Sequence, residues 1–169
     1  ILDGSSKMYT DEIAKIGLEE QAAERKYFVV KEQMEYVSED GLTKLTLLPD
    51  KDYNVNLVVA YDSPYLKMQY ATYSENNVDF AKDFAPCRTF VFLREIEMLL
   101  QHNLIKGGDL DNAIVIVDRK ISQEEVDRLA KLFNYDSIEV KEGILNNLTL
   151  YFDNEPARHK LLDVIGDLA

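Results

Sequence analysis

Three side chains near the end of the chain have types and spacing that could do chemistry. His159 and Asp163 are four residues apart, and Asp167 follows after four more. In an α-helix, residues at i and i+4 lie one above the other on the same face, so an imidazole nitrogen and a carboxylate oxygen can converge on one ion. The spacing therefore predicts two ligands of a metal site. A solvated helix face that happens to carry one histidine and two aspartates would show the same spacing.

The surrounding residues predict the helix that must position these side chains. Asn154 is a typical N-cap residue, and Pro156 suits the first turn of a helix. An apolar stripe is predicted opposite the polar side chains and consists of Leu161, Leu162, Ile165 and Leu168. This pattern indicates a helix with one face toward a core and the other toward the candidate ligands.

A catalytic zinc ion needs three protein ligands and an open position. The chain offers His159 and Asp163 but no obvious third ligand. The only other histidine, His102, lies near the end of a predicted helix, where it suits the negative end of the helix dipole. A complete zinc site would therefore need a ligand from elsewhere.

Length and composition limit the class of protein. The chain has 169 residues, of which 46% are hydrophobic, so it can form one domain over residues 1–169. A net charge of -12 argues against a nucleic-acid or anionic-membrane partner. One cysteine, Cys87, excludes an internal disulfide and fits the cytoplasm. No signal peptide or membrane-spanning apolar run is present, and the absence of a starting Met suggests a cut from a longer protein.

The order of predicted elements favours an α+β fold. Strand-like composition occurs first, at residues 26–37, 45–48, 54–61 and 67–73. Further strands are predicted at 113–117, 138–140 and 148–152, with helices at 7–16, 76–84 and 92–103 and from the capping box at Ser122. Strands in a row with helices gathered around them predict a two-layer sandwich, in which helices pack on one face of a mainly antiparallel sheet.

Four stretches together carry a more specific pattern. They are Ile1-Leu2-Asp3-Gly4-Ser5-Ser6, Arg88-Thr89-Phe90-x-Phe92-x-Arg94-x-Ile96-Glu97, Gly107-Gly108-x-Leu110-Asp111-Asn112-Ala113-Ile114-Val115 and Arg158-His159-Lys160-x-x-Asp163-x-x-Gly166-Asp167. In this order they resemble the UDP-3-O-acyl-N-acetylglucosamine deacetylase family, the zinc enzymes of lipid A synthesis in bacteria of the Gram-negative type. The resemblance covers essentially the whole chain and implies that it is the second domain of such an enzyme. Residues 119–143 look like an insertion with its own helix.

The resemblance implies a reaction and roles for several residues. The reaction is hydrolysis of the acetamide of UDP-3-O-(3-hydroxyacyl)-N-acetylglucosamine, which releases acetate in the cytoplasm. His159 and Asp163 are expected to hold Zn²⁺, Thr89 to place its hydroxyl at the oxyanion, and Asp167 to orient a histidine beyond this chain. The third zinc ligand and a glutamate base are expected in the first domain of the parent chain. The isolated chain is therefore predicted to be inactive.

Substrate contacts follow from the same resemblance. Residues expected to line the acyl-chain passage are Phe90, Leu93, Ile105, Gly108 and Ala113. Lys160 is expected to face the diphosphate or the sugar, and Tyr61 to stack on uracil through its π face. An ordinary core position for the apolar residues and an exposed helix position for Lys160 are the alternatives.

Other functions stay open at the level of sequence. The chain alone could be a non-catalytic module that binds an acyl chain or a nucleotide, or an acidic interaction domain. Some relatives are fused at the C-terminus to a 3-hydroxyacyl-carrier-protein dehydratase, so the parent of this chain could be such a bifunctional form. Zinc content and activity of a His159→Ala variant would separate these readings.

Overall fold

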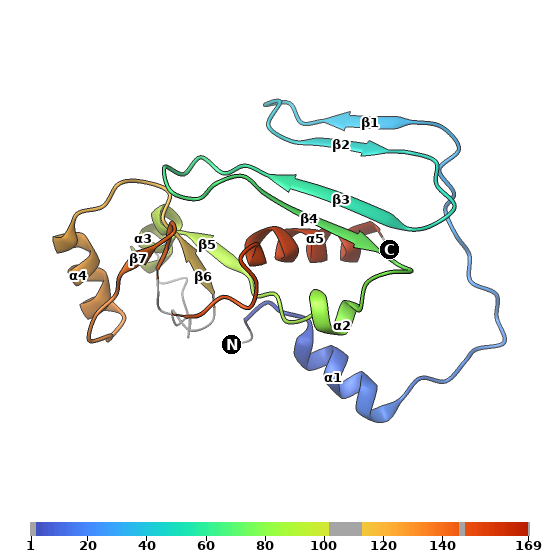
Figure 1. Ribbon diagram of the computed structural model, residues 1–169, viewed down its shortest axis with the longest axis horizontal. Coiled ribbons are helices and arrows are strands. Elements are labelled where there is room, and N and C mark those ends of the chain that lie inside the picture. The colour runs from blue at the N-terminus through green and yellow to red at the C-terminus, as the bar shows by residue number, and fades with distance from the viewer. Residues whose placement is uncertain (1–2, 102–112, 146–147, 169) are drawn as a thin grey trace.

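In the computed structural model, residues 3–101, 113–145 and 148–168 of the chain are described. Two strand hairpins and the last helix, α5 (Glu155–Leu168), form one end of the molecule. A small sheet and the helices α3 (Leu93–Gln101) and α4 (Gln123–Leu132) form the other end (Figure 1). The predicted α+β class with mainly antiparallel strands is confirmed.

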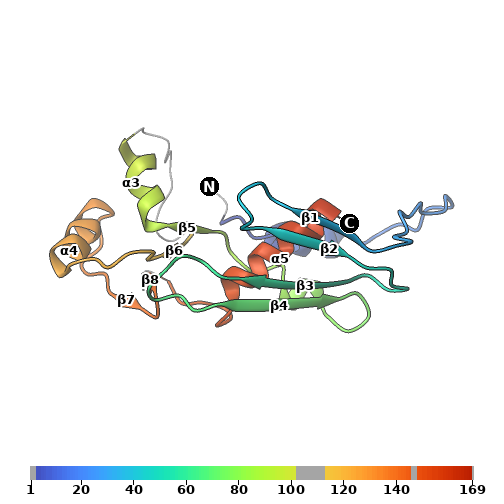
Figure 2. The same cartoon turned by 90° about the horizontal axis from the view of Figure 1, so that it is seen from above.

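The hairpin of β3 (Asn54–Val59) and β4 (Gln69–Ser74) positions the last helix. Its antiparallel register runs from Asn54 opposite Ser74 to Val59 opposite Gln69. Helix α5 lies along this hairpin (Figures 1 and 2) and packs on it through Ala157, Leu161 and Ile165. The buried stripe therefore begins earlier than predicted, and Leu168, which was expected in it, is exposed.

The first third of the chain contains one helix and one hairpin. Helix α1 (Lys7–Ile16) ends at Gly17, as predicted, and Gly17 has a φ of +86°. Strands β1 (Met34–Val37) and β2 (Lys44–Leu47) pair antiparallel in a two-stranded sheet of their own. The first half of the chain therefore does not form one continuous antiparallel sheet, because no ladder joins this hairpin to β3 and β4.

The second sheet has four short strands in the order β5-β6-β8-β7. They are β5 (Phe90–Phe92), β6 (Ile114–Ile116), β8 (Ile144–Leu145) and β7 (Val140–Lys141). Strands β5 and β6 are parallel, and the other pairs are antiparallel. A parallel pair needs a crossover connection, and α3 lies within that connection.

The predicted insertion at residues 119–143 contributes to the core of this end. Its helix α4 begins after Ser122, whose hydroxyl accepts the N–H of Glu125 at 3.3 Å, as the capping signal predicted. Val126 and Leu129 of α4 pack in a cluster with residues of α3, β6 and β8. The inserted residues therefore form an edge of the molecule in Figure 1 but share its apolar core.

One predicted strand and the boundaries of another strand and of one helix are corrected. Of the predicted strand at 26–37 only Met34–Val37 forms a strand, β1, and residues 148–152 form none. Helix α2 (Phe80–Asp83) is shorter than the predicted 76–84, because Asp79 caps it by accepting the N–H of Lys82 at 3.3 Å. Among the described helices, none combines the length and apolarity required to cross a membrane.

Candidate active site

The first three turns of α5 carry Glu155, His159 and Asp163 in one row at intervals of four residues. Glu155 and His159 are buried, whereas the Asp163 side chain is 42% exposed. Because the apolar side of α5 packs on β3 and β4, this row faces the segment 87–90, which leads from α2 into β5. His159 and Asp163 therefore lie between the buried first turn of α5 and its exposed last turn.

The imidazole of His159 is oriented by a backbone carbonyl group. Its Nδ1 lies 3.1 Å from the carbonyl oxygen of Cys87, and a carbonyl oxygen can only accept a hydrogen bond. We therefore assign the proton of the neutral ring to Nδ1 and the lone pair to Nε2, which lies 3.7 Å from Oδ1 of Asp163. Such an outer hydrogen bond is typical of metal-ligating histidines. A buried and oriented imidazole does not fit the alternative of a solvated helix face.

The two oxygens of Asp163 make different contacts. Oδ1 faces His159, and Oδ2 accepts Nζ of Lys160 at 3.0 Å. One imidazole nitrogen and one carboxylate oxygen are ligand types that zinc takes. Within the described residues, no group of three or more His, Cys, Asp and Glu side chains could hold a metal ion. His159 and Asp163 therefore fit two positions of a zinc site, and Asp167, one turn further, is exposed.

Thr89 is held in place through its backbone on both sides. Its N–H donates to the carbonyl oxygen of Asp3 at 2.9 Å, and its carbonyl oxygen accepts the N–H of Ile114 at 2.9 Å. Gly4 packs against its side chain so closely that a Cβ at Gly4 would stand 2.6 Å from Cβ of Thr89. The start of the chain and β6 therefore both position this threonine.

The residues around Thr89 contact the candidate zinc ligand. Cys87 does so through its carbonyl oxygen, and the ring centroid of Phe90 lies 6.1 Å from that of the His159 imidazole. A residue before Thr89 in the chain, Cys87, and the residue after it, Phe90, therefore contact His159. This is the neighbourhood in which an oxyanion-stabilising hydroxyl is expected.

A buried ion pair that the sequence analysis missed joins the same two elements. Nε of Arg88 donates to Oε1 of Glu155 at 2.9 Å, and Nη2 donates to Oε2 at 3.0 Å. In the sequence, an acidic residue in the first turn of a helix is explained by the helix dipole alone. The one available signal was the position of Arg88 at the start of the Arg88-Thr89-Phe90 stretch.

An aromatic cluster lies beside the candidate ligands. The ring centroid of Tyr61 is 5.4 Å from that of Phe90 and 5.2 Å from that of Phe92. Nζ of Lys160 is 5.7 Å from the Phe90 centroid. Burial, and then the carboxylate of Asp163, raises the pKa of Tyr61 to about 12, so the phenol stays protonated at neutral pH. Its hydroxyl is buried and has no hydrogen-bond partner in the described structure.

The structure brings together most, but not all, of the predicted site residues. Those that contact one another around the first turns of α5 are Tyr61, Phe90, His159, Lys160 and Asp163, whereas Thr89 precedes Phe90 in the chain and its side chain lies against Gly4. Leu93 is fully buried in the separate cluster of α3, α4 and β6, and Ala113 lies half-buried before β6. Ile105, Gly108 and His102 lie outside the described residues.

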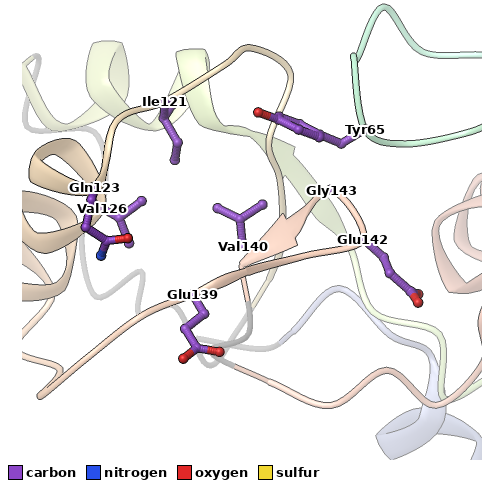
Figure 3. Close-up of a pocket in the computed structure, with 8 residues that line it drawn as sticks. All are labelled: Tyr65, Ile121, Gln123, Val126, Glu139, Val140, Glu142 and Gly143. Atoms are coloured by element: carbon purple, nitrogen blue, oxygen red, sulfur yellow. The ribbon is translucent and has the colours of Figure 1, made fainter.

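A separate cavity of about 580 Å³ lies at the edge formed by the predicted insertion. Its lining residues are Tyr65, Ile121, Gln123, Val126, Glu139, Val140, Glu142 and Gly143. Figure 3 shows Ile121, Val126 and Val140 around the space, whereas the carboxylates of Glu139 and Glu142 point away from it. The cavity shares no residue with the candidate active site.

Comparison with known proteins matches the whole chain. A family model described as UDP-3-O-acyl N-acetylglycosamine deacetylase (LpxC) matches residues 1–134 and 135–169. A bifunctional enzyme LpxC/FabZ from Porphyromonas gingivalis is 48% identical over 170 residues, which are 100% of this chain and 37% of that protein.

Other relatives show the same partial coverage. A bifunctional enzyme LpxC/FabZ from Bacteroides thetaiotaomicron is 46% identical over 100% of this chain and 37% of that protein. A UDP-3-O-acyl-N-acetylglucosamine deacetylase from Geobacter sp. (strain M21) is 35% identical over 100% of this chain and 47% of that protein. The chain therefore spans less than half the length of these relatives.

Proposed function

Because the chain belongs to the UDP-3-O-acyl N-acetylglycosamine deacetylase family, we propose that it supplies part of the active site of a zinc-dependent deacetylase of lipid A biosynthesis. The substrate is UDP-3-O-(3-hydroxyacyl)-N-acetylglucosamine. One water is consumed: its oxygen adds to the acetamide carbon, the C–N bond breaks, acetate leaves and the amine nitrogen takes up a proton. The observation that carries this proposal is the convergence of His159 and Asp163 beside the segment 87–90.

His159 and Asp163 are the residues of this chain that would hold zinc. The carbonyl of Cys87 keeps the Nδ1–H of His159 engaged, which leaves Nε2 and Oδ1 of Asp163 as the neighbouring donor atoms. Zinc supplies Lewis-acid chemistry, in which a carbonyl is polarised and hydroxide becomes available at neutral pH. In this proposal the third ligand, a histidine, and the general base, a glutamate, come from the first domain of the parent chain.

The remaining polar side chains act on the charges that develop during the reaction. Thr89 donates its hydroxyl to the oxyanion that forms at the acetamide carbon, an interaction whose loss commonly costs ~10²-fold or more in rate. Lys160, half-buried beside Asp163, presents a point charge to the diphosphate or the sugar. Asp167, which is exposed, orients a histidine from outside this chain.

The substrate contacts extend the proposal to the aromatic and apolar residues. Tyr61 stacks on uracil, and the acyl chain follows a passage lined by Phe90, Leu93, Ile105, Gly108 and Ala113. The proximity of Tyr61 and Phe90 supports a continuous substrate path past the candidate ligands. The bifunctional LpxC/FabZ relatives support a parent protein with a fused dehydratase. In this proposal the parent protein acts in the cytoplasm of a bacterium of the Gram-negative type.

The test compares zinc content and acetate release of the full-length protein with those of His159→Ala and Asp163→Asn. Each variant is expected to lose zinc on dialysis and at least ~10²-fold in kcat/KM, more than is usually lost with a residue that only hydrogen-bonds to a metal ligand. Asp127→Asn is the matched control, because Asp127 is an exposed helical aspartate that accepts Nε2 of Gln123 at 2.8 Å. Retention of both zinc and activity by either ligand variant would contradict the proposal.

A second candidate function applies to the chain by itself. The described residues offer two candidate metal donors, whereas a catalytic zinc ion needs three protein ligands. The isolated chain is therefore expected to act as a non-catalytic module that binds an acyl chain or a nucleotide. Titration of the isolated chain with uridine diphosphate, followed by fluorescence of the tyrosines, tests this function. Binding without turnover would support it, and the absence of binding would remove it.

A further inference from the structure

Glu155 accepts four hydrogen bonds, which together occupy both oxygens of its carboxylate. Oε1 accepts the backbone N–H of Arg88 at 3.0 Å and Nε of the same residue at 2.9 Å. Oε2 accepts Nη2 of Arg88 at 3.0 Å and the N–H of Tyr151 at 2.8 Å. An ionised carboxylate has about four acceptor positions, so Glu155 has none left for a metal ion or a substrate. Its contacts are all within the protein.

Arg88 is anchored just as completely. Its Nη2 also donates to the carbonyl oxygen of Thr149 at 2.7 Å, and its guanidinium carbon lies 4.4 Å from the ring centroid of Tyr151. The Arg88 side chain is 9% exposed and that of Glu155 is 0% exposed. The pair therefore joins the segment before β5, the segment before α5 and the first turn of α5.

Stability alone is a poor explanation for such a pair. The desolvation of two buried charges offsets much of their attraction, so a buried ion pair contributes little compared with apolar packing. A bidentate pair does determine geometry, because two parallel hydrogen bonds set both a distance and an orientation. The geometry set here is that between α5 and the segment 87–89.

The pair lies next to both parts of the candidate active site. Glu155 is one turn before His159, and Arg88 stands between Cys87 and Thr89. The segment is attached to α5 at two successive turns, through Arg88 at Glu155 and through Cys87 at His159. Together with the backbone bonds of Thr89 to Asp3 and Ile114, these two attachments fix how the segment lies against α5. The position of the Thr89 backbone relative to His159 follows from them.

We infer that Arg88 and Glu155 are positioning residues for deacetylation, which hold Thr89 and the imidazole of His159 in the arrangement that the reaction needs. This inference rests on the proposed function, in which His159 binds zinc and Thr89 stabilises the oxyanion. Neither Arg88 nor Glu155 touches the substrate. Arg88 acts through its neighbours in the chain, and Glu155 acts through Arg88.

A double-mutant cycle on the zinc-loaded full-length protein tests the inference. Glu155→Gln is expected to lower kcat at least ~10-fold with KM within about 2-fold, at a temperature where circular dichroism shows the variant folded. Thr89→Val is expected to lower kcat ~10²-fold. If Glu155 acts through Thr89, adding Glu155→Gln to Thr89→Val costs less than about 3-fold more. The matched control is Glu124→Gln, which changes an exposed glutamate of α4 and is expected to match the wild type.

Zinc affinity, measured by competition with a chelator, is a readout that does not depend on turnover. Glu155→Gln is expected to weaken zinc binding about 10-fold, at the low end of the cost of losing an outer partner of a metal ligand, because Glu155 acts through Arg88 on that partner, Cys87. Glu124→Gln is expected to leave it unchanged. A role in stability alone would lower the melting temperature and leave the zinc affinity of the folded protein as it was.

Two results would overturn the inference. One is an equal loss of kcat from Glu155→Gln with and without Thr89→Val together with wild-type zinc affinity, and the other is a folded Glu155→Gln with wild-type kcat and zinc affinity. If Glu155→Gln does not fold, Arg88→Lys takes its place in the cycle, since lysine keeps the charge but not the bidentate geometry. If the wild type releases no acetate, the proposed function fails, and zinc affinity alone decides whether the pair positions His159.

Discussion

Replacement of Gly4 by alanine places a methyl group against the side chain of Thr89. Gly4 has a φ of +74°, and its added Cβ would stand 2.6 Å from Cβ and 3.0 Å from Cγ2 of Thr89. Carbon atoms in contact keep about 3.5–4.0 Å, so Thr89 has to move by about 1 Å. Its N–H is bonded to the carbonyl oxygen of Asp3, directly before Gly4, which limits how the two segments can separate.

Gly4→Ala is expected to lower both the stability of the folded protein and the rate of the reaction. Alanine in the left-handed region costs about 1–2 kcal/mol of stability. A displacement of ~1 Å in a group that acts in the transition state can cost ~10²-fold in rate, which is about 2.7 kcal/mol of transition-state stabilisation. We therefore expect Gly4→Ala to lower kcat ~10²-fold while the protein stays folded.

Gly17→Ala is the matched control for this prediction. Gly17 has a φ of +86°, and a Cβ there would meet nothing within 4 Å. Both variants are expected to lose stability in thermal unfolding, Gly4→Ala more because of its contact with Thr89, and only Gly4→Ala is expected to lose kcat in acetate-release assays on the full-length protein. Equal kcat values for Gly4→Ala and Gly17→Ala would refute the idea that Gly4 positions Thr89.

Four further predictions concern packing, accessibility and completeness of the site. Leu161→Ala empties a fully buried position between α5 and the β3–β4 hairpin and is expected to cost about 2–5 kcal/mol; an unchanged denaturant midpoint would contradict this. Burial raises the pKa of the Cys87 thiol to about 12, so only about one thiol in 10⁴ is ionised at pH 8. Mass spectrometry is expected to show labelling by iodoacetamide only after unfolding, and rapid labelling of the native protein would argue against a buried thiol. Gly143→Ala, at a φ of +83°, places a Cβ 2.8 Å from Cβ of Tyr65 and is expected to destabilise by at least ~2 kcal/mol; a melting temperature equal to that of the wild type would disprove it. The chain 1–169 alone is expected to release no acetate in the presence of zinc, and turnover above the blank would show that no outside ligand is needed.

Elements that depend on short-range signals could be predicted from the sequence. A glycine with positive φ ends α1 at Gly17, and the hydroxyl of Ser122 caps the start of α4. The pairing of His159 with Asp163 was equally local, because four residues are about one turn of a helix. Each of these features needs only neighbours in the chain, so composition and spacing are sufficient to find them.

The wrong strand at residues 148–152 has a specific cause in side-chain hydrogen bonds. The carbonyl oxygen of Thr149 accepts Nη2 of Arg88, and the N–H of Tyr151 donates to Glu155. Backbone groups that a ladder would use are thus bonded to a buried ion pair. At residues 27–29 the apolar side chains are exposed instead, with Phe28 at 83%, so β-rich composition alone did not produce a strand.

By itself the sequence determined the family resemblance, the α+β class and two candidate zinc ligands on one helix, because each depends on local order and spacing. The tertiary structure decided which segment faces those ligands. Cys87 and His159 are 72 residues apart, and Arg88 and Glu155 are 67 apart. Contacts of this kind arise when apolar packing brings α5 against the β3–β4 hairpin and so places the polar row of α5 beside Cys87 and Arg88. No periodicity in the chain encodes that approach, because it depends on how separate elements pack in three dimensions.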